Sequence, residues 1–166
     1  MRGAARMVGM AMAGCLWMMT GCGAVVSQDL QTTAKDFSLK DLNGGTVTLE
    51  GLLGQNKAAL LNFTATWCPY CKDEIPELIE LQNTYQPRGF TVLGVDVGES
   101  QAKVAGFAQK MRINYPVLLD TDSAVAESYG VVGIPTSYLV DRQGKVIGQY
   151  HRITKELVRK IEEAVQ

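Results

Sequence analysis

Two cysteines, Cys68 and Cys71, stand three positions apart where an apolar run ends and a helical pattern begins. The run, residues 58–64, predicts a buried strand, because it is short and apolar and is followed at once by a change of periodicity. The helical pattern has one mostly apolar face, with residues at spacings of four, three and four: Glu74, Leu78, Leu81 and Tyr85. A C-x-x-C pair at a strand-to-helix junction predicts reversible thiol chemistry.

The start of the helix would activate the first sulfur of this pair. Backbone N–H groups in the first turn have no partner within the helix, and they form the positive end of the helix dipole. A thiolate at Cys68 would be stabilised there, and its pKa would fall below that of a free cysteine. Pro69 fits this placement, since proline is favoured at the first helical position. We expect Cys68 to be the more exposed nucleophile and Cys71 to be the resolving thiol.

A structural disulfide and half of a zinc site are the other uses of such a pair. Tetrahedral zinc would need further ligands, and no second C-x-x-C pair accompanies Cys68 and Cys71. The single histidine, His151, lies far along the chain and is more typical of a surface or packing residue than of a ligand. We therefore expect redox exchange and no metal.

One globular domain, residues 34–166, must position the cysteines. Its strands and helices alternate in a β-α-β order that implies parallel neighbouring strands with right-handed crossovers. Two short strands around a glycine turn at 43–45 predict a hairpin at the edge of the domain. The other expected strands span 58–64, 90–97, 115–119, 131–140 and 146–150, and the expected helices span 50–55, 68–87, 101–111, 123–129 and the segment after a Thr154 cap.

The first residues predict export. Arg2 and Arg6 precede an uncharged, apolar segment, residues 7–20, which has the length of a signal-peptide core and is too short for a membrane span. The segment leads into a Met-Thr-Gly-Cys sequence at 19–22, which resembles the lipobox of bacterial lipoproteins, where the cysteine is lipidated. An ordinary signal peptide cut nearby, with Cys22 a leftover thiol, is the alternative.

These features divide the chain into a signal peptide at 1–21, a lipidated tether at 22–33 and the domain at 34–166. Either kind of signal exports the domain from the cytoplasm, and in a Gram-negative cell the domain would face the periplasm. Loss of Arg2 and Arg6 from the 16 basic residues leaves 14 against 17 acidic ones, a net charge of −3 with histidine neutral. This balance gives no indication of nucleic-acid binding.

The motifs together resemble the thioredoxin superfamily: Trp67-Cys68-x-x-Cys71-Lys72, then Pro76, and far downstream Gly133-Ile134-Pro135-Thr136. The chain is similar above all to the membrane-tethered TlpA/ResA-like thiol-disulfide oxidoreductases, which share the segments at 97–100 and 115–120. The resemblance covers residues 34–166. It implies an α/β, thioredoxin-like fold: a central mixed β-sheet flanked by helices, with an N-terminal β-hairpin and an inserted β-α unit.

The resemblance also implies a substrate-binding surface beside the cysteines. It implies a cis bond between Ile134 and Pro135 that faces the disulfide, with the Ile134 backbone free to pair with an extended substrate segment. Trp67 is expected to cap the site as an apolar contact surface, with plain core packing as the alternative. Tyr70, between the cysteines, is a further candidate for substrate contact.

Two positions depart from the family pattern. Thioredoxin has a buried aspartate where this chain has Asn62, which cannot exchange a proton. Glu74, three residues after Cys71 on the same helix face, is expected to replace it as a desolvated carboxyl group that passes protons. A solvated acid at the helix start is the alternative interpretation. The Pro69-Tyr70 dipeptide has the proline first, and it leaves the reduction potential open.

The function that these residues predict is exported dithiol-disulfide exchange on protein substrates, with a Cys68–Cys71 disulfide and no other cofactor. The resemblance suggests a reductant for substrates such as apocytochrome c, which is itself reduced by a membrane thiol-disulfide transporter of the DsbD/CcdA kind. One alternative is an oxidant that donates disulfides. Another is a thiol peroxidase, although Thr66 and Phe63 do not fit the Pro-x-x-x-Thr-x-x-Cys spacing. A copper chaperone that uses both cysteines and His151 is the third.

Overall fold

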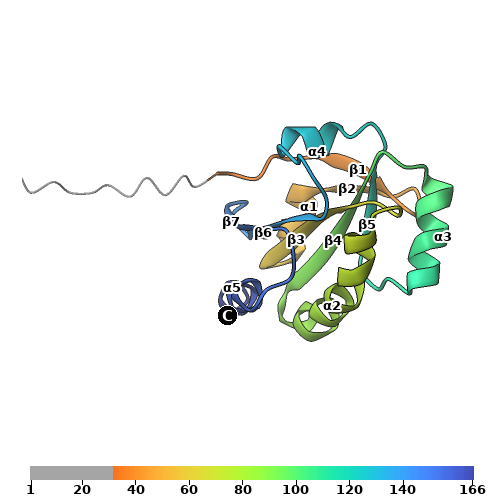
Figure 1. The fold of residues 1–166 in the computed structure, drawn as a ribbon. Helices are drawn as coiled ribbons and strands as arrows, with labels where there is room; N and C mark the ends of the chain where they lie inside the picture. The colour runs from red at the N-terminus through yellow and green to blue at the C-terminus, as the bar shows by residue number, and fades with distance from the viewer. Residues whose placement is uncertain (1–31) are drawn as a thin grey trace, which may run out of the picture.

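The computed structural model of this protein describes residues 32–166, whose arrangement is drawn in Figure 1. The predicted signal peptide at 1–21, the lipidation of Cys22 and the tether up to residue 31 lie outside the described residues. A search of residues 32–166 for a helix with the length and apolar character to cross a membrane finds none.

A seven-stranded mixed sheet forms the centre of the domain, in the order β2-β1-β5-β4-β3-β6-β7. β3, β4 and β5 are parallel neighbours, whereas β6 runs antiparallel to β3 and each end of the sheet is an antiparallel hairpin. The strands are β1 Ser38–Asp41, β2 Thr46–Thr48, β3 Ala58–Thr64, β4 Phe90–Val97, β5 Val117–Asp120, β6 Thr136–Asp141 and β7 Val146–Tyr150.

Helices cover both faces of this sheet (Figure 1). Buried side chains from α2, α3 and α5 pack on one face, and those from α1 and α4 pack on the other. The helices are α1 Leu49–Gln55, α2 Pro69–Tyr85, α3 Gln101–Met111, α4 Ala124–Ser128 and α5 Lys155–Ala164, with one turn of 3-10 helix at Gln86–Arg88. The expected fold class is confirmed, including the N-terminal hairpin β1-β2 and the inserted unit α3-β5.

The central position of β3 explains its apolar sequence. Leu60 and Leu61 are both fully buried, yet they point to opposite faces and belong to different clusters of the core. A strand covered on both faces is apolar at nearly every position instead of in an alternating pattern. Removing either leucine side chain would cost about 2–5 kcal/mol of stability, so β3 is a rigid base for the turn that follows it.

Two predicted strands begin later than expected. β6 starts at Thr136 and not at residue 131, because residues 130–135 form a loop that contains a cis Ile134–Pro135 bond. β5 starts at Val117, since Pro116 has no N–H to donate and offers only its carbonyl oxygen, which accepts from Gly94 N at 2.9 Å. The loop at 130–135 is called the cis-proline loop below.

The end of the predicted tether is attached to the domain. Thr33 forms an isolated antiparallel bridge with Lys145, and the N–H of Val146 donates to the carbonyl oxygen of Thr32 at 2.9 Å. The chain therefore enters the described structure along the edge of β7.

Three segments converge at one edge of the sheet. The turn after β3 (65–68), the loop after β4 (98–100) and the cis-proline loop before β6 meet there. The strand register requires this, because Thr64 pairs with Asp96 on β4 and Phe63 pairs with Thr136 on β6. Parallel strands place their carboxyl ends at the same edge, and this is where α/β sheets place their sites.

Candidate active site

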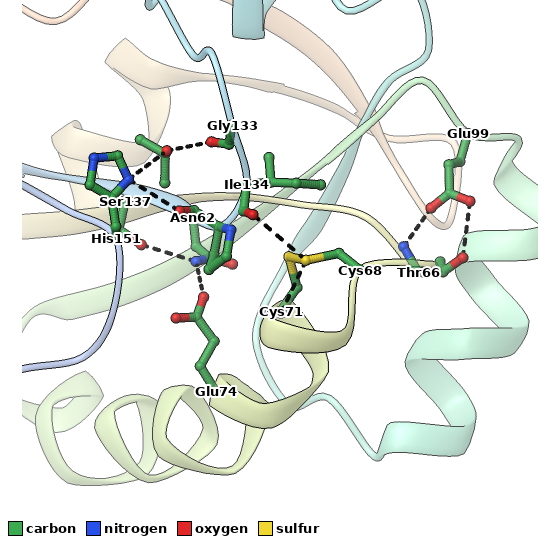
Figure 2. Close-up of a disulfide and its surroundings, with 12 residues drawn as sticks. Asn62, Thr66, Cys68, Cys71, Glu74, Glu99, Gly133, Ile134, Ser137 and His151 are labelled. Carbon is green, nitrogen blue, oxygen red and sulfur yellow. Dashed lines mark hydrogen bonds between the residues drawn. A yellow bond between two sulfur atoms is a disulfide. The ribbon is translucent and has the colours of Figure 1, made fainter.

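Cys68 and Cys71 form a disulfide at the start of α2, with their Cα atoms 5.3 Å apart (Figure 2). The exposed fractions of the two residues are 3% and 2%, so both are buried in this disulfide form, and the expectation that Cys68 is the more exposed nucleophile stays a prediction. The cis-proline loop contributes to the burial of Cys68, because the carbonyl oxygen of Ile134 lies 3.8 Å from Cys68 Sγ. A disulfide sulfur carries no proton, so this is a packing contact.

The helix start is directed at Cys68 as expected. Cys68 is the N-cap residue of α2, Pro69 occupies the first turn, and the N–H of Cys71 donates to Cys68 Sγ at 3.2 Å. After reduction, the same N–H and the positive end of the helix dipole would stabilise a thiolate on Cys68. Cys68 is therefore the sulfur best placed to act as the nucleophile.

The cis-proline loop faces this pair. The peptide bond between Ile134 and Pro135 is cis, which confirms the expectation, and Thr136 Oγ1 donates to the carbonyl oxygen of Gly133 at 2.6 Å. Proline at this position leaves no N–H beside the sulfur atoms, while the Ile134 carbonyl group stays directed at them. The loop can thus present a backbone group to an extended chain that approaches Cys68.

Glu74 is buried on α2, one turn beyond Cys71, with 7% of its surface exposed. Its Oε1 accepts a hydrogen bond from Asn62 Nδ2 at 2.6 Å, and the same amide nitrogen donates to Ser137 Oγ at 2.9 Å. Burial is the main reason that the pKa of Glu74 is raised to about 7; the Asn62 hydrogen bond opposes the increase and the charge of Glu77 adds to it. The expected burial of Glu74 is confirmed, and its role in proton transfer stays a prediction.

Asn62 therefore has a function in the geometry of the site that the sequence did not reveal. It cannot carry a proton, but both hydrogens of its amide are used, one toward Glu74 on α2 and one toward Ser137 on β6. Its partnership with Ser137 depends on the pairing of β3 with β6, in which the two residues are directly opposite.

A second acidic group lies on the other side of the disulfide (Figure 2). Glu99 accepts from the Thr66 N–H at 2.5 Å and from the Thr66 hydroxyl group at 2.9 Å, and it pairs with Lys103. Burial works against its ionisation, but the hydrogen bonds from Lys103 and Thr66 outweigh burial and hold the pKa of Glu99 below its usual value. Glu99 therefore anchors the turn that leads to Cys68, a role that the sequence analysis did not assign.

Asp96, at the end of β4, is the third buried carboxyl group here. It is 2% exposed, and its Oδ1 has no hydrogen-bond partner. Burial, together with the neighbouring Glu99, raises the pKa of Asp96 to about 7 against the opposing charge of Lys103. An acidic residue at the carboxyl end of a predicted parallel strand was the sequence signal that could have indicated this group.

Large apolar side chains are exposed on the segments that carry the disulfide and the cis-proline. Trp67 and Tyr70 are 62% and 76% exposed, so the alternative that Trp67 is plain core packing is wrong. Val132, in the cis-proline loop, is fully exposed and was missed. Large exposed apolar residues that gather around a reactive group are typical of a surface that contacts other proteins.

A groove of about 600 Å³ lies between α2 and the cis-proline loop. Tyr70 and Glu74 line it from the helix, Ile134 and Pro135 from the loop, and His151 from the segment after β7. His151 is an exposed residue, in keeping with the expected surface position, but the sheet brings it back to the groove although it lies far along the chain. Within residues 32–166, no group of three or more histidine, cysteine or acidic residues is arranged to hold a metal ion.

Comparison with known proteins gives consistent results. Residues 30–149 match the model of the AhpC/TSA family. The thiol-disulfide oxidoreductase ResA of Geobacillus thermodenitrificans is 40% identical over 115 residues, which are 69% of this chain and 65% of the relative, so the match spans slightly less than two thirds of that protein.

Solved structures extend the comparison to nearly whole chains. A thiol:disulfide interchange protein of the thioredoxin family from Chlorobium tepidum has a TM-score of 0.70 at 34% identity, and the match covers 82% of this chain and 97% of the other. The thioredoxin domain of a thiol-disulfide oxidoreductase from Bacteroides vulgatus has a TM-score of 0.73 at 27% identity, with the same coverage of 82% and 97%.

Proposed function

Because this chain belongs to the AhpC/TSA family and is a TlpA/ResA-like member of the thioredoxin superfamily, we propose that it is a thiol-disulfide oxidoreductase that acts on protein substrates. One observation carries this proposal. The Cys68–Cys71 disulfide lies at a helix start, faces a cis-proline loop and has a buried carboxyl group of raised pKa one turn away.

The exchange has two steps. In the first, the Cys68 thiolate attacks a sulfur of the substrate disulfide, so that a Cys68–substrate bond forms, the substrate S–S bond breaks and one substrate thiolate leaves. In the second, Cys71 gives up its proton and attacks Cys68 Sγ, which forms the Cys68–Cys71 bond and releases the second substrate thiolate. Two electrons pass from the cysteine pair to the substrate. Glu74 accepts the Cys71 proton in this scheme.

The proposal extends to the place and direction of the reaction. The lipobox-like sequence that ends at Cys22 supports an exported, membrane-anchored protein, with the domain held outside the cytoplasm. A reductant in an oxidising compartment needs a supply of electrons, for which a membrane transporter of the DsbD/CcdA kind is the proposed donor. We propose a reducing role, with apocytochrome c as the substrate class.

The reduction potential of the Cys68–Cys71 disulfide tests the direction of electron flow. Equilibration with glutathione buffers should give a value near or below about −220 mV for a reductant, whereas a value near about −120 mV would make the protein a disulfide donor. A Cys71→Ser variant tests the mechanism, because it should accumulate a mixed disulfide between Cys68 and the substrate. If the Cys71→Ser variant forms no mixed disulfide with any protein substrate, exchange through Cys68 would be contradicted.

A further inference from the structure

His151 is the first residue after β7, and its side chain reaches back to the cis-proline loop (Figure 2). Its Nδ1 lies 3.1 Å from Thr136 Oγ1 and 3.4 Å from the carbonyl oxygen of Pro135. The last backbone pair between β6 and β7 joins Ser137 to Tyr150. The imidazole ring therefore continues the connection between these strands by one residue, at the point where the backbone ladder has ended.

The hydrogen-bond partners determine which ring nitrogen carries the proton. The Thr136 hydroxyl group has one hydrogen, and it donates this hydrogen to the carbonyl oxygen of Gly133 at 2.6 Å. Thr136 Oγ1 can then only accept from His151, and the carbonyl oxygen of Pro135 can only accept as well. Nδ1 must be the donor to both, and Nε2 is the nitrogen left without a role in these contacts.

This arrangement fixes the loop on both sides of Ile134. Gly133 is held through the Thr136 hydroxyl group, and Pro135 is held directly by the ring. Ile134 lies between these two points, and its carbonyl oxygen is the loop atom that lies 3.8 Å from Cys68 Sγ. A shift of the loop would therefore change the distance between Cys68 and any substrate backbone paired with residue 134.

We propose that His151 is a positioning residue: its Nδ1–H holds the cis-proline loop so that the Ile134 backbone presents a protein substrate to Cys68. The inference depends on the proposed function, because it concerns how a protein disulfide is held during the first exchange step. It predicts an effect on extended protein substrates, which use the loop, that exceeds the effect on a small disulfide, which does not.

Three substitutions separate the two ring nitrogens. His151→Asn places an amide N–H where Nδ1 lies, His151→Gln places its amide near Nε2, and His151→Ala removes both. The measurement is single-turnover reduction of insulin and of 2-hydroxyethyl disulfide by the pre-reduced protein. We expect the ratio of the two rate constants to fall about 5-fold in the alanine and glutamine variants, the effect of one hydrogen bond, and to stay within about 2-fold of the native ratio in the asparagine variant.

A second readout is independent of turnover. Amide hydrogen exchange at Ile134 and Thr136 should be faster in the alanine and glutamine variants and native-like in the asparagine variant. An asparagine variant as impaired as alanine, a glutamine variant that restores the ratio, or an unchanged ratio in all three variants would each overturn the proposal. If the native protein fails to reduce insulin while loop exchange follows the expected order, the proposed function fails and the positioning contact stands.

Discussion

Two buried glutamates flank the disulfide, Glu74 on one side and Glu99 on the other (Figure 2), and their partners give them opposite protonation behaviour. Glu74 receives a hydrogen bond from a neutral amide, that of Asn62, and its pKa is raised to about 7. Glu99 receives two hydrogen bonds from Thr66 and pairs with the Lys103 ammonium group, and its pKa is lowered.

The comparison teaches that burial alone does not decide what an acid does in this site. The two residues expose the same 7% of their surface, although the Glu99 carboxyl group lies closer to the surface, beside the half-exposed Lys103. A neutral donor leaves the cost of ionisation largely uncompensated, so Glu74 can gain and lose a proton near neutral pH. A cation and two donors compensate that cost at Glu99, which stays ionised and fixes the turn before Cys68.

Replacing Glu74 by glutamine should have the largest effect on the proposed exchange. The ionised carboxylate accepts the Cys71 proton, so resolution of a mixed disulfide should accelerate in the native protein as pH rises through about 7. In Glu74→Gln we expect this step to be about 100-fold slower just above that pH, the usual size of a lost general base. Its pH profile should lose the rise near pH 7 and increase only as the Cys71 thiol itself ionises. Rapid-quench measurement of Cys68–substrate disulfide decay from pH 5 to 9 provides the check.

Glu80→Gln is the matched control, since Glu80 is an exposed acid on the same helix. It should preserve both the rate and the pH profile. A pH profile in Glu74→Gln that keeps its rise near pH 7 would remove Glu74 from the proton transfer.

Replacing Glu99 by glutamine should instead affect stability. The neutral amide loses the ion pair with Lys103 and weakens the two hydrogen bonds from Thr66, at a cost of about 2 kcal/mol in the free energy of unfolding. Urea denaturation of the oxidised protein measures this loss. The pH profile of the resolution step should keep its native shape. A Glu99→Gln variant that loses the rise near pH 7 would show that Glu99, like Glu74, takes part in the proton transfer.

Asp96 sharpens the comparison, because it lies next to Glu99 but its pKa is raised like that of Glu74. Its pKa is about 7 in the folded protein against 3.8 for the ordinary value, so the folded state binds the proton more tightly. Its contribution to stability is complete below pH 3.8 and is lost as pH rises through about 7. Glu74, raised from 4.5 to about 7, acts in the same direction. The native protein should therefore become less stable between about pH 4 and pH 8.

An Asp96→Asn variant should lose the part of this decline that Asp96 causes. Its free energy of unfolding should exceed that of the native protein by about 1 kcal/mol or more at pH 8, with a smaller difference at pH 5. Its amide can also donate to Glu99. Denaturation midpoints across this pH range measure the effect. The control is Asp73→Asn, which changes an exposed aspartate on α2. The stability of this variant should fall with rising pH as that of the native protein does. A pH-independent difference between Asp96→Asn and native would contradict the raised pKa.

The sequence could predict the parts of this site that local patterns encode. The apolar run of β3, the helix start at Cys68 and the apolar stripe that ends at Tyr85 determined the strand, the turn and α2 to within a residue or two. Glu74 was identifiable because it lies three residues from Cys71 on one helix face. The first part of the cis-proline loop was mistaken for strand, since Val131 and Val132 have strand propensity and only the tertiary structure places them in a loop.

The remaining contacts depend on sheet pairing between distant segments. Asn62 meets Ser137 across β3 and β6, Thr66 meets Glu99 across the edge of the sheet, and His151 returns to residue 136 through the β6-β7 hairpin. The two residues of each pair are far apart in the sequence, so no helical or strand periodicity could indicate these contacts. They could be predicted only once the order of the strands in the sheet was known.

Two ion pairs with the same spacing provide the finest test of the comparison between neutral and charged partners. Lys103 pairs with Glu99, whose side chain is 4% exposed, whereas Arg159 pairs with Glu163, whose side chain is 49% exposed. Lys103→Met leaves a desolvated carboxylate without its cation and should cost about 1 kcal/mol, while Arg159→Met should cost at most about 0.5 kcal/mol, as exposed pairs do. Since Lys103 is itself 55% exposed, added salt should reduce both losses. Equal losses in the two variants, measured by urea denaturation at low salt, would mean that the hydrogen bonds from Thr66 hold Glu99 ionised without help from Lys103.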